Sequence, residues 1–142
     1  MNKLLQLMVD SALRRQRKKI RHDADFRVKA YLERIVRYFD AEKAGKRCMT
    51  VVYEIHDSKD NNGVWTISIA NGKCELSEGE PENFDTKLYM TAEVYERIVT
   101  GRLEFGRLAY LTGAVRYYGN SLGHRELNSY LSIPKDAGVA AL

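Results

Sequence analysis

The hydrophobic pattern changes its period near residue 50, and this change constrains the fold more than any other feature of the sequence. From Val51 to His56 and again from Val64 to Ala70, apolar side chains alternate with more polar ones. Such alternation is typical of a strand with one buried face. Asn71-Gly72 is the strongest short hairpin signal in the chain, and Cys74 and Leu76 continue the alternation after it. The pattern predicts a three-stranded antiparallel meander with one apolar face and one wetter face.

A helical pattern precedes these strands. Asp23 or Asp25 is suited to cap the start of a second helix, or else interrupts one long helix, and Gly45 is suited to follow the helix end. Between them, apolar residues recur at the spacing of one helix face. The members of this stripe are Val28, Leu32, Ile35 and Phe39.

A second group of strands and helices follows an acidic loop. Residues 88–90 predict a fourth strand, and Thr91 is placed to cap a helix from about residue 92 to residue 100, which Gly101 closes. A short helical turn is expected near residues 105–110, and residues 115–118 alternate as a fifth strand.

A last helix is expected after a cap at Asn120 or Ser121, with Leu127 and Leu131 on its apolar side. Strands that are segregated from helices in this order indicate an α+β fold. We therefore expect a five-stranded antiparallel sheet with helices packed on one face.

The positive charge is concentrated at the start of the chain. Residues 1–22 hold seven Lys or Arg and one acid, whereas the other 120 residues hold 16 basic and 18 acidic groups. A nucleic-acid-binding fold would spread its positive charge over the domain, so no nucleic-acid partner is expected. The same segment has an amphipathic helical pattern, with an apolar stripe made of Leu4, Leu5, Met8, Ala12 and Leu13.

This pattern predicts an N-terminal helical extension, residues 1–22, ahead of a domain at 23–134 and a tail at 135–142. An apolar stripe followed by a basic cluster suits an anionic membrane surface. A protein partner, a second copy of the chain, packing on the domain itself and a transit peptide are the alternatives. The oligomeric state is left open, and a dimer is one option.

The chain shows no signature of catalysis. His22, His56 and His124 lack the spacing of metal ligands, and no Gly-rich phosphate loop or nucleophile elbow is present. We therefore expect no enzyme, no cofactor and no metal.

Cys48 and Cys74 occur without a recognisable secretory leader, which predicts free thiols in the cytoplasm.

Four stretches carry a resemblance to a known family. They run from Trp65 to Gly72, from Leu88 to Glu93, from Gly101 to Leu103 and from Gly113 to Asn120. In this order, over roughly residues 27–131, the chain resembles the sterol carrier protein type 2 family. The resemblance implies an apolar tunnel between the sheet and the helices, which holds a sterol, fatty acyl or isoprenoid ligand without enzymatic chemistry.

The inward-facing apolar residues are the candidate ligand contacts, and the simpler alternative is that they only fill a core. The set is Tyr53, Ile55, Trp65, Ile67, Ile69, Leu88, Met90, Val94, Ile98, Phe105, Leu108, Leu111, Val115, Tyr117, Leu122 and Leu131. The predicted function is binding of a lipid-like ligand, with its transfer as an extension. The alternative is an accessory or scaffold subunit of a lipid or isoprenoid-quinone pathway that acts through protein partners.

Overall fold

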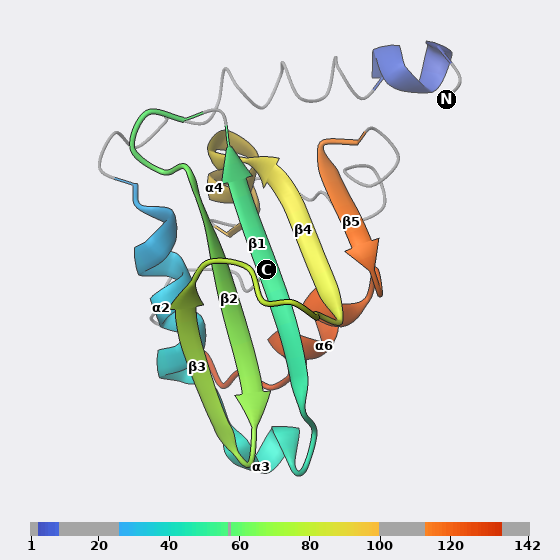
Figure 1. Cartoon of the computed structure of the whole chain (residues 1–142). Coiled ribbons are helices and arrows are strands. Elements are labelled where there is room, and N and C mark those ends of the chain that lie inside the picture. The colour runs from blue at the N-terminus through green and yellow to red at the C-terminus, as the bar shows by residue number, and fades with distance from the viewer. Residues whose placement is uncertain (1–2, 9–25, 57, 100–112, 135–142) are drawn as a thin grey trace.

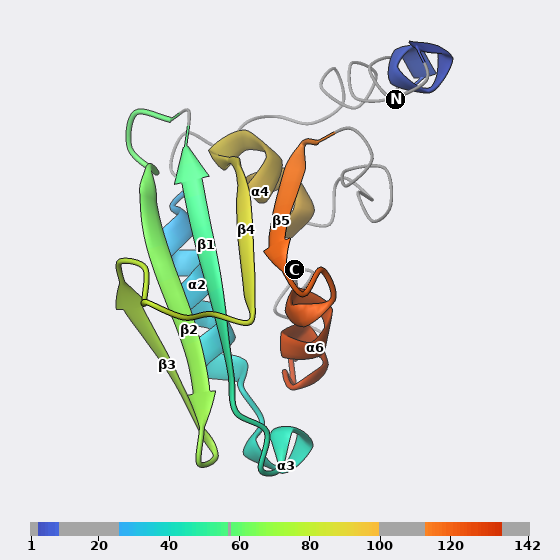
Figure 2. The same cartoon turned by 45° about the vertical axis from the view of Figure 1, so that its right-hand side comes forward.

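The computed structural model describes residues 3–8, 26–56, 58–99 and 113–134. Residues 3–8 are helical. The strands and the other helices are α2 (Val28–Tyr38), α3 (Ala41–Ala44), β1 (Met49–His56), β2 (Gly63–Ala70), β3 (Lys73–Glu78), β4 (Thr86–Thr91), α4 (Ala92–Val99), β5 (Val115–Gly119) and α6 (Gly123–Ser129). Helices α2, α4 and α6 lie on one face of a five-stranded sheet, which confirms the predicted α+β class (Figures 1 and 2).

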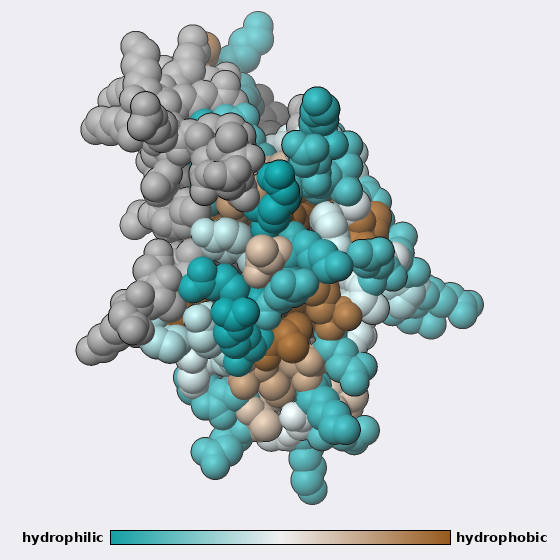
Figure 3. Space-filling model, turned by 90° about the vertical axis from the view of Figure 1, so that its left-hand side faces the viewer, coloured by the Kyte–Doolittle hydropathy of each residue, from teal (hydrophilic) through white to brown (hydrophobic). Residues whose placement is uncertain are grey.

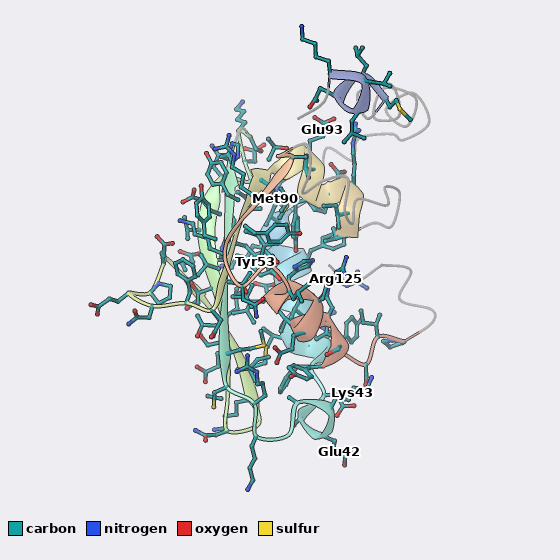
Figure 4. The ribbon with its side chains drawn as sticks, turned by 90° about the vertical axis from the view of Figure 1, so that its right-hand side faces the viewer. Glu42, Lys43, Tyr53, Met90, Glu93 and Arg125 are labelled. Atoms are coloured by element: carbon teal, nitrogen blue, oxygen red, sulfur yellow. The ribbon has the colours of Figure 1, made fainter. Side chains whose placement is uncertain are left out.

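The strands are ordered β3-β2-β1-β4-β5, and one of the four pairings is parallel. β1 runs antiparallel to β2 but parallel to β4, so the expectation of a purely antiparallel sheet was wrong at this pair. The physical reason is the loop of residues 79–85, which carries the chain from β3 past β2 and β1 to the start of β4 (Figure 1). It crosses the face of the sheet opposite the helices (Figure 4).

Hydrogen bonds fix both ends of this crossing loop. At its start, the hydroxyl of Thr66 donates to the carbonyl oxygen of Gly79 at 2.6 Å. At its end, the backbone N–H of Thr50 donates to the Asp85 carboxylate at 2.8 Å, and the Asp85 N–H donates to the Thr50 carbonyl at 3.0 Å. The loop therefore holds β4 beside β1 in a defined register.

The hairpin between β2 and β3 follows the predicted turn chemistry. Asn71 and Gly72 have φ angles of 53° and 74°, and a type I′ turn requires a positive φ at both central positions.

The start of α4 also agrees with the sequence, because the Thr91 hydroxyl accepts a hydrogen bond from the Val94 N–H at 3.2 Å. The expected helix end at Gly101 and the expected turn at 105–110 lie outside the described residues.

The helix expected to continue to Gly45 is instead broken after Tyr38. Asp40 caps the separate turn α3 by accepting from the Glu42 N–H at 3.0 Å. The segment after α6 holds the break, since the Asp40 N–H donates to the Tyr130 carbonyl and the Ser132 N–H donates to the Tyr38 carbonyl. Gly45 follows the end of α3 rather than the end of α2.

The predicted cap at Asp23 or Asp25 was also wrong, because α2 begins at Val28 after Arg27. Arg27 makes no side-chain cap. Asn61, from the connection between β1 and β2, supplies the cap instead. Its side-chain oxygen accepts from the Val28 N–H at 2.9 Å, and its amide donates to the Phe26 carbonyl at 3.2 Å.

Candidate ligand-binding site

The face of the sheet that meets the helices is apolar across all five strands. Register pairing places Tyr53 opposite Trp65 and Leu88, and places Leu88 opposite Tyr117. Both Tyr53 and Met90 lie between the sheet and the helices (Figure 4). The buried apolar residues of this inner face are Met49, Val51, Tyr53, Ile55, Trp65, Ile67, Ile69, Leu88, Met90 and Val115.

The helices complete the wall opposite this face. α2 contributes Val28, Leu32 and Ile35, and α4 contributes Ala92, Tyr95 and Val99. α6 adds Leu127. Together with the sheet residues these side chains form one continuous apolar cluster.

The structure places most of the predicted ligand contacts in or against this cluster. Tyr53, Ile55, Trp65, Ile67, Ile69, Leu88, Met90, Val115 and Leu131 are buried, and Val94, Ile98 and Tyr117 are partly buried against them. Phe105, Leu108 and Leu111 lie outside the described residues. Contact of the placed residues with a ligand remains a prediction.

Leu122 does not belong to this wall. Its side chain is 58% exposed, so the expectation that it faces the interior was wrong. The reason is local. Leu122 precedes the first turn of α6, where the Asn120 side chain accepts its N–H at 2.9 Å. Gly123 and Leu127 are the residues of this helix that turn inward.

Two inner aromatic residues were not among the predicted contacts. Tyr95 has no exposed surface, and Phe26 is 4% exposed. Their ring centroids lie 6.1 Å apart, and the Tyr95 ring also meets the edge of Tyr53 at 6.3 Å. The spacing of Ala92, Tyr95 and Val99 carries the signal for Tyr95, because positions i, i+3 and i+7 share one helix face.

The polar atoms of the inner aromatic residues have unusual surroundings. Among the residues that the structure describes, the hydroxyls of Tyr53 and Tyr95 and the Nε1 atom of Trp65 are buried and have no hydrogen-bond partner. Burial raises the pKa of both tyrosines far above the ordinary value. The nearby Tyr117 adds to the shift of Tyr53, and the nearby Tyr53 adds to the shift of Tyr95. Both hydroxyls therefore remain protonated donors at every physiological pH.

A groove opens beside this region, between α2 and β3. Its volume is about 340 Å³, and its lining residues are Lys29, Glu33, Val36, Trp65, Leu76, Ser77 and Glu78. Lys29 and Glu78 form an exposed ion pair at 3.5 Å. On this side of the molecule, hydrophobic residues are surrounded by hydrophilic ones (Figure 3). Trp65 thus connects the groove with the inner face of the sheet.

The opposite face of the sheet is more polar, although it also buries Val52. Lys87 lies 2.7 Å from Glu80 and 3.5 Å from Glu54, and its ammonium lies over the ring of Tyr118. Because a hydrogen bond to Glu80 stabilises its charged form, the pKa of Lys87 is raised. The two faces of the sheet therefore differ sharply in polarity, as the alternation predicted.

Within the described ranges, no group of His, Cys, Asp and Glu has the arrangement of a metal site. None of the helices in those ranges combines the length and hydropathy needed to cross a membrane.

This architecture is that of the sterol carrier protein 2 fold. The palmitated SCP2L2 of Aedes aegypti superimposes with a TM-score of 0.54 at 17% identity, over 70% of this chain and 89% of that chain. A possible sterol carrier protein from Thermus thermophilus gives a TM-score of 0.51 at 13% identity, over 75% and 87%. No family model and no curated protein sequence matches the chain.

Part of an enzyme has the same fold. The sec-alkylsulfatase Pisa1 from Pseudomonas sp. gives a TM-score of 0.60 at 19% identity, over 73% of this chain. Only 16% of the sulfatase chain takes part in this superposition. The similarity thus concerns one small part of a larger protein and describes the fold alone.

Proposed function

We propose that the protein binds an apolar, lipid-like ligand between the inner face of the sheet and the helices α2 and α4, without enzymatic chemistry. The observation that carries this proposal is the inner face itself, which presents Tyr53, Ile67 and Leu88 and their neighbours from every strand. The fold similarity to sterol carrier proteins, one of them palmitated, supports the same conclusion.

The energetics favour such a ligand. Each buried CH₂ group contributes about 0.8 kcal/mol, so a twelve-carbon chain contributes on the order of 10 kcal/mol before costs. Association costs about 4 kcal/mol or more, which leaves a Kd near the micromolar range.

Native mass spectrometry of the full chain, purified without detergent, tests the proposal. We expect a 1:1 adduct of lipid mass, released by organic solvent, and rebinding of fluorescent fatty-chain probes to the stripped protein. Protein that is always empty and also rejects both a fluorescent fatty acid and a fluorescent fatty alcohol would disprove the proposal.

We propose the N-terminal segment, residues 1–22, as the docking element that brings the domain to an anionic membrane. In the described part of this segment Leu4, Leu7 and Met8 are each about 60% exposed, and the basic cluster follows in the sequence. Near an anionic surface each Lys or Arg contributes about 1 kcal/mol. A lipid carrier loads and unloads at such a surface.

Vesicle co-sedimentation tests this docking role. Replacing Leu4, Leu7 and Met8 by Gln in the full chain should abolish binding to phosphatidylserine vesicles, whereas neutral vesicles should bind neither protein. Equal binding of both proteins to anionic vesicles would refute the role of the apolar side chains.

The second candidate is an accessory or scaffold subunit in a lipid or isoprenoid-quinone pathway. It is favoured by the exposed apolar side chains of residues 3–8 and by the occurrence of this fold within a larger enzyme. Affinity capture distinguishes the two candidates. A scaffold should recover a stoichiometric partner that the Gln variant loses, whereas a carrier acting alone should recover none.

A further inference from the structure

Three hydrogen-bond donors are buried on the inner side of the sheet with no acceptor among the residues that the structure describes. They are the Nε1 atom of Trp65 and the hydroxyls of Tyr53 and Tyr95. The two tyrosines have no exposed surface, and Trp65 is 8% exposed. Buried polar groups in native proteins almost always have a partner, because an unpaired one is costly. Three such groups together point to a bound molecule that supplies the acceptor.

The three donors are contiguous. Tyr53 and Trp65 are register partners on adjacent strands, so both side chains leave the same face of the sheet. The rings of Tyr53 and Tyr95 meet edge to face at a centroid distance of 6.3 Å. The donors therefore extend from β2 across β1 to α4, in the region between the sheet and the helices.

Local packing fixes the position of the Trp65 indole, which lies at the β2 end of the three donors. A Cβ atom on Gly63 would lie 2.8 Å from the indole atom Cη2 of Trp65. The ring thus occupies the space that a side chain at residue 63 would need. The indole is also a wall of the groove between α2 and β3.

The chemistry of the surroundings identifies the acceptor. The inner residues of β1, β2 and β4 are apolar or aromatic apart from Thr86, whose hydroxyl is already bonded to the Asn120 carbonyl. None of these inner strand positions carries Lys or Arg. In the helical wall, α4 buries Glu96, and the guanidinium of Arg34 in α2 lies over two tyrosine rings of its own helix. A buried carboxylate without a cation is strongly disfavoured, whereas an uncharged oxygen needs only the donors that are present.

We infer that Tyr53, Tyr95 and Trp65 bind the oxygen-bearing end of an otherwise apolar lipid, and that this end is an uncharged hydroxyl, ketone or ester. The inference rests on the proposed lipid-binding function and names the class of ligand. A pure hydrocarbon fills the same space but leaves the three donors unpaired.

Displacement of a fluorescent fatty-chain probe from the full-length, lipid-free protein tests the inference. The competitors are methyl laurate, an ester that only accepts hydrogen bonds, and tridecane, a hydrocarbon with the same number of carbon atoms. The variants are Tyr53→Phe, Tyr95→Phe and their combination. The control is Tyr118→Phe, on the exposed outer face of β5.

The wild-type protein should bind methyl laurate more tightly than tridecane. Each inner Tyr→Phe change should weaken methyl laurate binding by about 2- to 10-fold and leave tridecane binding unchanged, while the control changes neither. The thermal unfolding midpoint of the inner variants should be equal to or higher than that of the wild type, because the removed hydroxyl has no partner in the protein.

The results that would overturn the inference differ from the result that would overturn the proposed function. If the combined variant keeps its affinity for methyl laurate, the inference is wrong and lipid binding stands. If the midpoint falls while the ester affinity is unchanged, the hydroxyls are satisfied by the protein or by water, and the inference is again wrong. If neither the probe nor the competitors bind, the proposed function itself fails.

Discussion

His124 shows how a single partly buried residue links the fold to pH. Its ring stacks on Tyr117 of β5 with centroids 5.1 Å apart. Burial lowers the pKa of His124 to about 4, and the neighbouring charge of Arg125 acts in the same direction. The folded protein therefore favours neutral His124, whereas the unfolded chain, with the ordinary pKa of 6.5, binds the proton more readily.

It follows that the contribution of His124 to stability is complete above about pH 6.5 and is lost as the pH falls towards about 4. Urea unfolding at about pH 7.5 and about pH 5 should show a smaller acid loss in His124→Phe than in the wild type. Glu126 and Asp40, whose pKa values are also lowered, sensitise both proteins to acid equally. An identical acid loss in both proteins would contradict the buried, neutral imidazole.

At the scale of elements, the contact between α6 and β4 depends on a glycine. A Cβ atom on Gly123 would lie 1.8 Å from the hydroxyl oxygen of Thr86, which has no exposed surface. That hydroxyl is bonded to the Asn120 carbonyl at 2.5 Å, so it has little freedom to move. The absence of a side chain at residue 123 is what allows the helix to approach the sheet.

Gly123→Ala should therefore lower the free energy of unfolding by about 1–3 kcal/mol, or more. The sign is informative, since alanine is favoured over glycine in an isolated helix by about 1 kcal/mol. Arg125→Ala, at an exposed position of the same helix, is the control and should change stability by about 0.5 kcal/mol or less. A Gly123→Ala variant as stable as the control would refute the close approach.

The start of α2 depends on a side chain that is distant in sequence. Because Asn61 bonds both the Val28 N–H and the Phe26 carbonyl, the connection between β1 and β2 positions this helix over the sheet. Asn61→Ala should cost about 1–2 kcal/mol in chemical denaturation. Asn61→Asp keeps the acceptor and should cost less, and Asp60→Ala at the neighbouring exposed position should cost little. Equal stability of all three variants would exclude the tertiary cap.

At the scale of the whole molecule, the features that could be predicted from the sequence are those that follow from its hydrophobic periodicity. Alternation identified the strands and the apolar inner face, since a period of two places successive side chains on opposite faces. The Asn71-Gly72 dipeptide identified the hairpin turn. The strand partners were harder, because alternation does not encode direction. The parallel pairing of β1 with β4 depends on the crossing loop, whose anchor at Asp85 has no local signature.

Tertiary contacts decided the remaining differences. Phe39 continues the helical stripe of Leu32 and Ile35, yet the helix ends before it because the segment after α6 bonds to Tyr38 and Asp40. The unpaired hydrogen-bond donors of the interior could not be predicted from the sequence for another reason. Tyrosine and tryptophan fit an apolar pattern because of their rings. The pattern gives no information on whether their hydroxyl or N–H groups have hydrogen-bond partners.

A lipid against the inner face of the sheet would lie close to Trp65, the only tryptophan of the chain. The most direct measurement is quenching of Trp65 fluorescence by a fatty alcohol brominated near the middle of its chain, because bromine quenches only at close range. We expect saturable quenching with one-to-one stoichiometry, and no quenching by the same alcohol without bromine. Absent or unsaturable quenching, with the brominated alcohol shown to bind, would place the ligand elsewhere and exclude a lipid at the inner face.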